Sequence, residues 1–177
     1  QRMTFQASRP LALIYTFFRK LYNKLDFYIP DRYKEGYGIS FAGIEYARIQ
    51  GISLIIALDC GIKANDKVKY AKEQGIDLII CDHHNPGDQI PGACAMLDPK
   101  RPGCTYPFNE LSGCGVGFKL IQAFSKKNNI PFDELIPYLD LVAVSIASDI
   151  VPLIGENRVL AYYGMKQLNE NPRTGLK

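Results

Sequence analysis

The chain contains only two histidines, and these are adjacent residues, His83 and His84, directly after Asp82. The apolar run Leu78–Cys81 that precedes them is typical of a short strand buried on both faces. Imidazole and carboxylate groups are costly to bury unpaired and bind divalent metals well. The pattern therefore predicts a metal site at the end of this strand. A triplet that only caps the following turn is the simpler alternative.

A second acid follows another apolar run, because Asp59 comes directly after residues 53–58. Between the two runs, the sequence predicts a helix over Asp66–Gln74 with Asn65 as its N-cap. A strand–helix–strand unit of this length requires parallel strands and a right-handed crossover. Ligands bind outside the carboxyl ends of such strands. We therefore expect Asp59 to lie close to Asp82, His83 and His84.

Neighbouring side chains on an extended segment point in opposite directions. We accordingly expect one of His83 and His84 to bind the ion and the other to face substrate or support a ligand. Asp149, in the sequence Ser-Asp-Ile-Val-Pro after an apolar stretch, is a third candidate ligand. A turn aspartate before Pro152 explains its position equally well.

Three glycines, Gly113, Gly115 and Gly117, open a helix predicted from about residue 115 to residue 127. Glycines at a helix N-terminus allow a phosphate to approach the backbone N–H groups. Close helix packing is the alternative, and the residues alone favour it. Arg32 lies in a polar loop with several tyrosines and could contact a nucleic-acid backbone. A solvated loop is at least as good an explanation.

The rest of the chain alternates short apolar runs with amphipathic stretches. We expect helices over residues 11–25, 41–50, 133–147 and 156–168, and short strands over residues 26–30 and 93–97. Residues 1–10 show no periodicity and are predicted to be irregular. Ser40 and Ser112 are the expected N-caps of the helices that follow them. The fold class is α/β, with a parallel β-sheet flanked by helices.

Composition limits the remaining possibilities. The chain has 177 residues, of which 47% are hydrophobic and 22% charged, as in an ordinary globular domain. The net charge of +3 permits a nucleic-acid partner without arguing for one. Five cysteines without a C-x-x-C pair suggest a reducing, cytoplasmic setting. The longest apolar run, Leu11–Phe18, is too short to span a membrane.

Asp82-His83-His84 after a strand, with Asp59-Cys60-Gly61 one strand–helix unit earlier, resembles the DHH phosphoesterase superfamily. Residues 29–38, 111–120 and 148–158 are similar to its RecJ-like branch of single-strand-specific 5′→3′ DNA exonucleases. The similarity extends over residues 11–177. It implies a phosphodiesterase of DNA repair and recombination that uses two Mn²⁺ or Mg²⁺ ions.

The resemblance also implies roles for individual residues. Asp59, His83 and Asp149 would bind metal, and Asp82 would orient the cluster. His84 would face the scissile phosphate or support a ligand. The substrate-binding residues would be Gly113, Gly115 and Gly117 near the substrate strand, and Arg32 is added to them from its place in the polar loop. Single-stranded DNA would be the partner, with a single-strand-binding protein or a helicase added in the intact protein.

The family's first motif, a run of alternating aspartates, belongs just before Leu11, where residues 1–10 contain no carboxylate. We therefore expect residues 1–10 to lack this motif and residues 11–177 to form a DHH domain truncated before a nucleic-acid-binding domain. At most one well-held ion is then expected. Two alternatives stay open: a catalytically impaired or inert fragment, and a nanoRNase or cyclic-dinucleotide phosphodiesterase, against which residues 29–38 argue.

Overall fold

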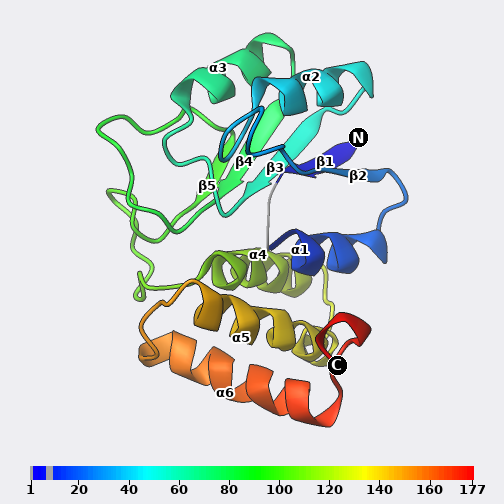
Figure 1. Ribbon diagram of the computed structural model, residues 1–177, viewed down its shortest axis with the longest axis vertical. Coiled ribbons are helices and arrows are strands. Elements are labelled where there is room, and N and C mark those ends of the chain that lie inside the picture. Colours follow the sequence, from blue (N-terminus) through cyan, green and yellow to red (C-terminus); the bar gives the residue numbers. More distant parts are fainter. Residues whose placement is uncertain (1, 7–9) are drawn as a thin grey trace.

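The computed structural model describes residues 2–6 and 10–177. In this part of the chain, five parallel strands form one sheet in the order β2-β1-β3-β4-β5 (Figure 1). The strands are β1 Met3–Gln6, β2 Leu25–Tyr28, β3 Leu54–Leu58, β4 Asp77–Cys81 and β5 Ala95–Leu97. The predicted α/β fold with a parallel sheet is confirmed.

The prediction that residues 1–10 are irregular is wrong for Met3–Gln6, which form the strand β1 inside the sheet. This strand pairs with β2 on one side and with β3 on the other, in the register Gln6↔Ala57. A four-residue strand is too short for a period-2 pattern to emerge, and its pairing partners are distant in the sequence. Residues 7–9, which belong to the same predicted segment, lie outside the described part of the chain.

Helices cover both faces of the sheet, and a further helical layer lies beyond one of them (Figure 1). Helices α2 (Phe41–Ile49) and α3 (Asn65–Glu73) lie on one face, and α1 (Pro10–Arg19) and α4 (Gly113–Lys127) lie on the other. Helices α5 (Leu139–Ser148) and α6 (Gly155–Glu170) pack together below α4.

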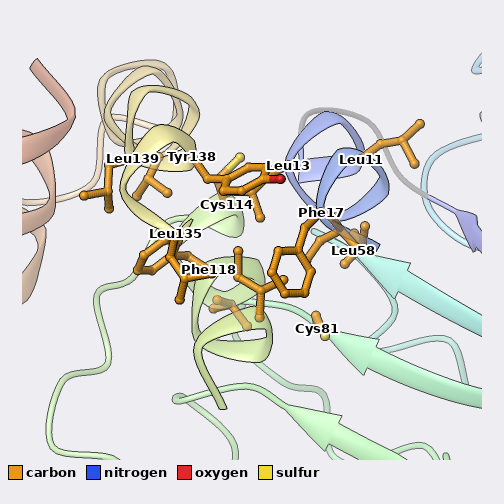
Figure 2. Close-up of a cluster of buried hydrophobic side chains, with 14 of the residues drawn as sticks. Leu11, Leu13, Phe17, Leu58, Cys81, Cys114, Phe118, Leu135, Tyr138 and Leu139 are labelled. Carbon is orange, nitrogen blue, oxygen red and sulfur yellow. The ribbon is translucent and has the colours of Figure 1, made fainter. Parts of the chain in front are cut away.

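The sheet separates two hydrophobic cores. Ile55 and Ala57 of β3 face α2 and α3, whereas Ile56 and Leu58 face α1 and α4. Figure 2 shows the larger core, to which α1 contributes Phe17, α4 contributes Phe118 and α5 contributes Leu139. Burial on both faces explains why β3 and β4 are continuous apolar runs.

Two predicted N-caps are confirmed and a third is wrong. The hydroxyls of Ser40 and Ser112 accept hydrogen bonds from the N–H groups of Gly43 (2.9 Å) and Gly115 (3.1 Å). Asn65 is the first residue of α3 rather than its cap, and its Nδ2 donates to the carbonyl of Gln89 at 3.2 Å.

The helix predicted over residues 133–147 is divided. Two 3-10 turns, Phe132–Glu134 and Ile136–Tyr138, precede α5. Pro137 lacks an N–H group and therefore interrupts the helical hydrogen bonds. Another 3-10 turn, Thr174–Leu176, follows α6. Among the described residues, no helix is both long and apolar enough to cross a membrane.

Candidate metal centre

Strands β3 and β4 lie side by side and end together, with Leu58 paired to Cys81. Their carboxyl ends adjoin the point between β1 and β3 where the strand order reverses, and open parallel sheets bind ligands there. The backbone N–H of Asp59 donates to the carbonyl of Cys81 at 2.8 Å. The residues after both strands, Asp59 and Asp82, are thus held at one edge of the sheet.

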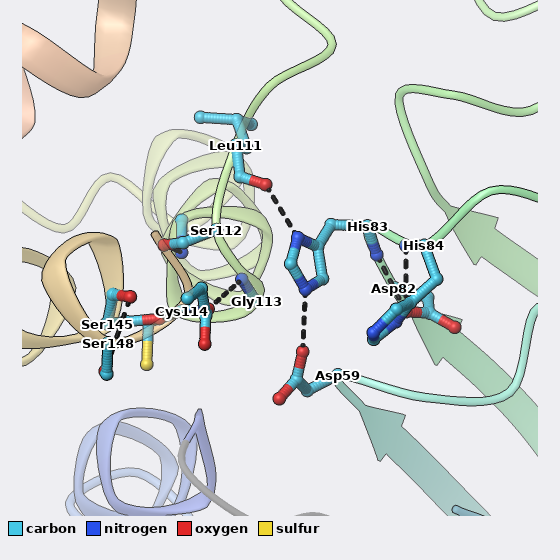
Figure 3. Close-up of polar contacts among 12 residues, drawn as sticks. Asp59, Asp82, His83, His84, Leu111, Ser112, Gly113, Cys114, Ser145 and Ser148 are labelled. Carbon is cyan, nitrogen blue, oxygen red and sulfur yellow. Dashed lines mark hydrogen bonds and ion pairs between the residues drawn. The ribbon is translucent and has the colours of Figure 1, made fainter. Parts of the chain in front are cut away.

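Three side chains at this edge form a group able to hold a cation. One ligand atom each from Asp59, His83 and His84 lies within 4.8 Å of the others (Figure 3). Asp59 and His83 are 8% and 9% exposed, whereas His84 faces solvent. A carboxylate oxygen and two imidazole nitrogens suit a divalent transition metal such as Mn²⁺.

The expectation that the two histidines point in opposite directions is wrong. Their ring centroids lie 4.6 Å apart, with the ring planes tilted by 59°. The strand ends at Cys81, and Oδ1 of Asp82 then accepts hydrogen bonds from the N–H groups of both His83 (2.8 Å) and His84 (3.3 Å). This aspartate turn bends the backbone out of the extended conformation and brings both rings to the same side.

His83 is oriented through both ring nitrogens. Its Nδ1 lies 3.0 Å from the carbonyl oxygen of Leu111, which can only accept, so Nδ1 carries a proton. Its Nε2 lies 3.0 Å from Oδ1 of Asp59. Burial lowers the pKa of His83, but the hydrogen bond and charge of Asp59 outweigh burial, and the net shift of the pKa is upward. The Nε2 position therefore favours a positive charge, either a proton or a metal ion.

Asp59 meets the conditions for a metal ligand. Apart from the His83 ring, no hydrogen-bond donor among the described residues reaches its buried Oδ1. Its backbone has φ +61°, a left-handed conformation that costs about 1–3 kcal/mol in a non-glycine residue and clusters at functional sites. The hydroxyl of Tyr37 donates to the Asp59 carbonyl at 2.8 Å. Burial and the charge of Asp59 raise the pKa of Tyr37 to about 12, so this donor stays protonated.

Asp82 supports the group without joining it. The residue is 1% exposed, and its Oδ1 lies 2.6 Å from Nδ1 of His84 while its Oδ2 accepts the N–H of Ile62 at 2.9 Å. With Nδ1 of His84 occupied by this contact, Nε2 is the nitrogen left for a ligand. A carboxylate behind a metal-binding histidine fixes the ring orientation and increases its basicity. The orienting role expected for Asp82 stays a prediction.

Asp149 lies at the edge of the centre. It is the C-cap of α5, and its Oδ2 accepts hydrogen bonds from Ser145 Oγ (3.0 Å) and from the N–H of Gly113 (3.3 Å). It does not belong to the 4.8 Å group, but its charge contributes to the raised pKa of His83. Asp149 is thus near enough to act on the centre electrostatically.

The three glycines have different positions from those expected. A Cβ atom on Gly113 would lie 2.3 Å from Oδ1 of Asp59, so this glycine leaves room for the candidate ligand. A Cβ atom on Gly117 would contact Ile14 of α1 at 3.4 Å, and one on Gly115 would contact Leu111. Gly115 and Gly117 are buried and lie at these packing contacts, and their expected place in substrate binding stays a prediction.

Arg32 lies close to the centre. Its guanidinium carbon is 5.3 Å from the ring centroid of Tyr37, and both residues line a hollow that also includes Asp59. The ring of Tyr37 in turn lies against His84, with a centroid distance of 6.3 Å. A cation beside an exposed aromatic ring next to a metal centre can contact a phosphate and a base.

Two backbone groups of the site were not predicted from the sequence. The Leu111 carbonyl and the Ile62 N–H are backbone groups, and nothing in the sequence indicates which way they point. The hydrogen bond from Tyr37 to Asp59 was not predicted either, because it joins residues 22 positions apart.

Comparison with known proteins identifies the family. The DHH family, N-terminal domain, matches residues 10–146. The chain belongs to the DHH family. RecJ from Bacillus subtilis, a single-stranded-DNA-specific exonuclease, is 49% identical over 159 residues, which is 90% of this chain. RecJ from Escherichia coli is 35% identical over 165 residues.

Solved structures agree with this assignment. A crystal structure of exonuclease RecJ bound to manganese matches 99% of the DHH chain with a TM-score of 0.84 and 26% identity. RecJ from Thermus thermophilus in complex with Mn²⁺ has the same fold, with a TM-score of 0.77 and 24% identity. The chain spans 20% and 29% of the length of the Bacillus and Escherichia relatives, and 46% and 26% of the two solved chains.

The sequence around β1 contains no acidic residue that could add to the candidate metal centre. The register Gln6↔Ala57 places the end of β1 two residues short of the level of Asp59. The first acidic residue of the sequence is Asp26, so residues 1–25 contain no carboxylate. A second ion would need further anionic ligands at this edge.

Proposed function

We propose that this chain is the metal-binding DHH part of a single-stranded-DNA-specific exonuclease that acts 5′→3′ in DNA repair and recombination. The observation that carries the proposal is the group Asp59, His83 and His84 at the carboxyl edge of the sheet. The similarity to RecJ relatives over 90% of the chain supports the substrate class. The proposal places the protein in the cytoplasm, with single-stranded DNA as its partner and a single-strand-binding protein or a helicase as further partners of the intact protein.

Mn²⁺ or Mg²⁺ is the proposed cofactor, and the residues fit such an ion. Asp59 would bind through its carboxylate, and His83 and His84 through Nε2, while Asp149 adds negative charge beside them. When bound, the ion supplies Lewis-acid polarisation of the phosphate and a bound water of lowered pKa. The proposed metal ligands include His84 and do not include Asp149. The reason is that His84, unlike Asp149, belongs to the group whose ligand atoms lie within 4.8 Å of one another.

The residues around the ion have separate tasks. The Leu111 carbonyl and Asp82 hold the two imidazoles in the tautomer that leaves Nε2 available. Tyr37 holds the Asp59 backbone. Arg32 would bind a phosphate of the single strand, with Tyr37 offering its ring to a base.

Calorimetric titration of the chain with Mn²⁺ tests the centre. We expect one site, and we expect His84→Ala or Asp59→Ala to abolish it, whereas Lys166→Ala on the distant, exposed face of α6 leaves it unchanged. Cleavage of a 5′-labelled single-stranded oligonucleotide, compared with its duplex and with dinucleotides, tests the substrate. Preference for dinucleotides would replace the exonuclease with a nanoRNase-type activity.

One observation favours a second candidate function, a chain that binds the ion and the DNA without cleaving it. Residues 1–25 contain no carboxylate, so the anions that a two-ion reaction needs are missing on one side. One Mn²⁺ site together with DNA binding and no product would support this candidate. Two tight sites would contradict it.

A further inference from the structure

The first turn of α6 ties together two chain segments next to the metal centre. The side-chain amide of Asn157 donates one hydrogen bond to the carbonyl of Glu110 at 2.6 Å and another to the carbonyl of Pro152 at 3.0 Å. Asn157 is 0% exposed. Both N–H groups of one buried amide are therefore used to join segments 42 residues apart in the sequence.

Each of these segments contributes a group to the candidate metal centre or its surroundings. Glu110 immediately precedes Leu111, whose carbonyl oxygen holds Nδ1 of His83. Pro152 follows Asp149 by three residues, and Asp149 accepts the N–H of Gly113. Because neither segment is a helix or strand at these positions, side-chain hydrogen bonds decide where their carbonyls lie.

The surroundings of Asn157 hold the turn firmly. Gly155 has φ +49°, and a Cβ atom there would lie 2.7 Å from the ring of Phe108, so the start of α6 is in direct contact with residues 108–110. Glu156 pairs with Lys119 of α4 and accepts the hydroxyl hydrogen of Tyr106 at 2.7 Å. These contacts fix the position of the first turn of α6 and therefore of the side-chain amide of Asn157.

We propose that Asn157 is a positioning residue of the metal centre: it holds the 110–111 segment so that the Leu111 carbonyl keeps His83 in the tautomer with its proton on Nδ1. That tautomer leaves the lone pair of Nε2 for the ion. The inference deepens the proposed function, because it concerns the same centre. Groups that orient a metal-binding histidine typically contribute 10–100-fold to metal affinity or activity.

Asn157→Asp tests the inference, because it keeps the size of the side chain and removes both N–H donors. The chain has only two histidines, so ¹⁵N NMR resolves both imidazoles without ambiguity. We expect the Nδ1–H signal of His83 in the ion-free variant to shift toward that of a group without a hydrogen bond, because the Leu111 carbonyl no longer holds its position. We also expect the affinity for Mn²⁺ to fall about tenfold or more.

Arg173→Gln is the matched control. It removes a partly buried ion pair with Asp140, which orders a distant part of the molecule, and so costs stability without touching the centre. If the control alters the His83 signal as much as Asn157→Asp does, a general loss of stability explains the effect and the inference fails. Should Asn157→Asp not fold, Asn157→Ser takes its place, since its shorter side chain cannot reach both carbonyls.

The NMR measurement also separates the two proposals. A wild-type chain that binds no Mn²⁺ would overturn the proposed function, yet the Nδ1–H signal of His83 in Asn157→Asp would still decide the positioning role. A variant with the wild-type His83 signal would overturn that role even if the wild-type chain binds Mn²⁺ tightly.

Discussion

Gly113 is in contact with both Asp59 and Asp149, the two acids at the candidate metal centre. Its N–H donates to Asp149, and the space where a Cβ would be is filled by the carboxylate of Asp59. The absence of a side chain at this residue is thus a condition for the observed position of Asp59.

Gly113→Ala should reduce the affinity for Mn²⁺ by about tenfold or more, because the added Cβ would lie 2.3 Å from Oδ1 of Asp59 and displace it. Alanine favours the helix by about 1 kcal/mol relative to glycine, so the fold should survive. Calorimetric titration measures the effect. Gly115→Ala is the control, since its Cβ would approach no atom closer than 3.4 Å; equal losses in both variants would contradict the steric explanation.

Asp98 is a buried acid beside the centre. It is 2% exposed, its Oδ1 accepts the N–H of Lys100 at 2.8 Å, and its Oδ2 has no hydrogen-bond partner among the described residues. Burial raises the pKa of Asp98, and the charge of Asp82 adds to the shift. Compared with the unfolded chain, the folded state therefore favours the neutral form of the Asp98 carboxyl group.

Asp98→Asn should increase the free energy of unfolding at neutral pH by about 1 kcal/mol, because the uncharged amide removes the cost of holding a buried charge. In acid, the carboxyl group is neutral in both the folded and the unfolded chain, so the variant should gain little. As the pH rises past the ordinary aspartate pKa, the unfolded chain ionises first and the wild type loses stability that the variant keeps. Urea denaturation at several pH values measures this difference, and a gain independent of pH would contradict the explanation.

At the scale of elements, α5 and α6 pack closely because of Gly164. A Cβ atom there would lie 2.3 Å from the carbonyl oxygen of Leu139 and 2.6 Å from Cβ of Ala143. This pair of helices carries Asp149 at the end of one member and Asn157 in the first turn of the other. The distance between the helices therefore bears on both residues.

Gly164→Ala should lower the free energy of unfolding by about 2 kcal/mol, because the helices must separate to admit the methyl group. The gain in helix propensity offsets only part of this cost. Thermal unfolding measures the change. Gly175→Ala, where a Cβ atom meets nothing within 4 Å, should leave the midpoint nearly unchanged; a similar loss there would show that packing is not the cause.

At the scale of the whole molecule, one ion pair fixes the segment after α6 to the start of α5. Arg173 donates through Nε and Nη2 to the two carboxylate oxygens of Asp140, at 2.6 and 2.7 Å, and also to the carbonyl of Pro137 at 2.8 Å. Asp140 is 1% exposed. The planar guanidinium group is suited to this two-point contact.

Arg173→Gln should lower the free energy of unfolding by about 3 kcal/mol, because it leaves the buried carboxylate of Asp140 without its charge partner. Urea denaturation measures the loss, and the affinity for Mn²⁺ should stay at the wild-type value. Lys166→Gln is the control: its pair with Glu170 spans 3.8 Å between exposed side chains and should contribute less than about 1 kcal/mol. Equal losses in the two variants would contradict the role of burial.

The sequence by itself determined the sheet around β3 and β4 and the grouping of Asp59 with Asp82, His83 and His84. Continuous apolar runs predict strands buried on both faces, and the helix predicted between them requires parallel neighbours with their carboxyl ends at one edge. These inferences depend on residues that are close in the chain, so the pattern alone was sufficient.

Only the tertiary structure decided the place of β1, the side-by-side rings of His83 and His84, and the contacts of Asn157. β1 is a strand because of two partners far away in the sequence, and the rings lie together because Asp82 bends the backbone after β4. The carbonyls of Leu111 and Glu110 are backbone groups that every residue type has. Their direction is set by long-range hydrogen bonds, which leave no pattern in the order of the residues.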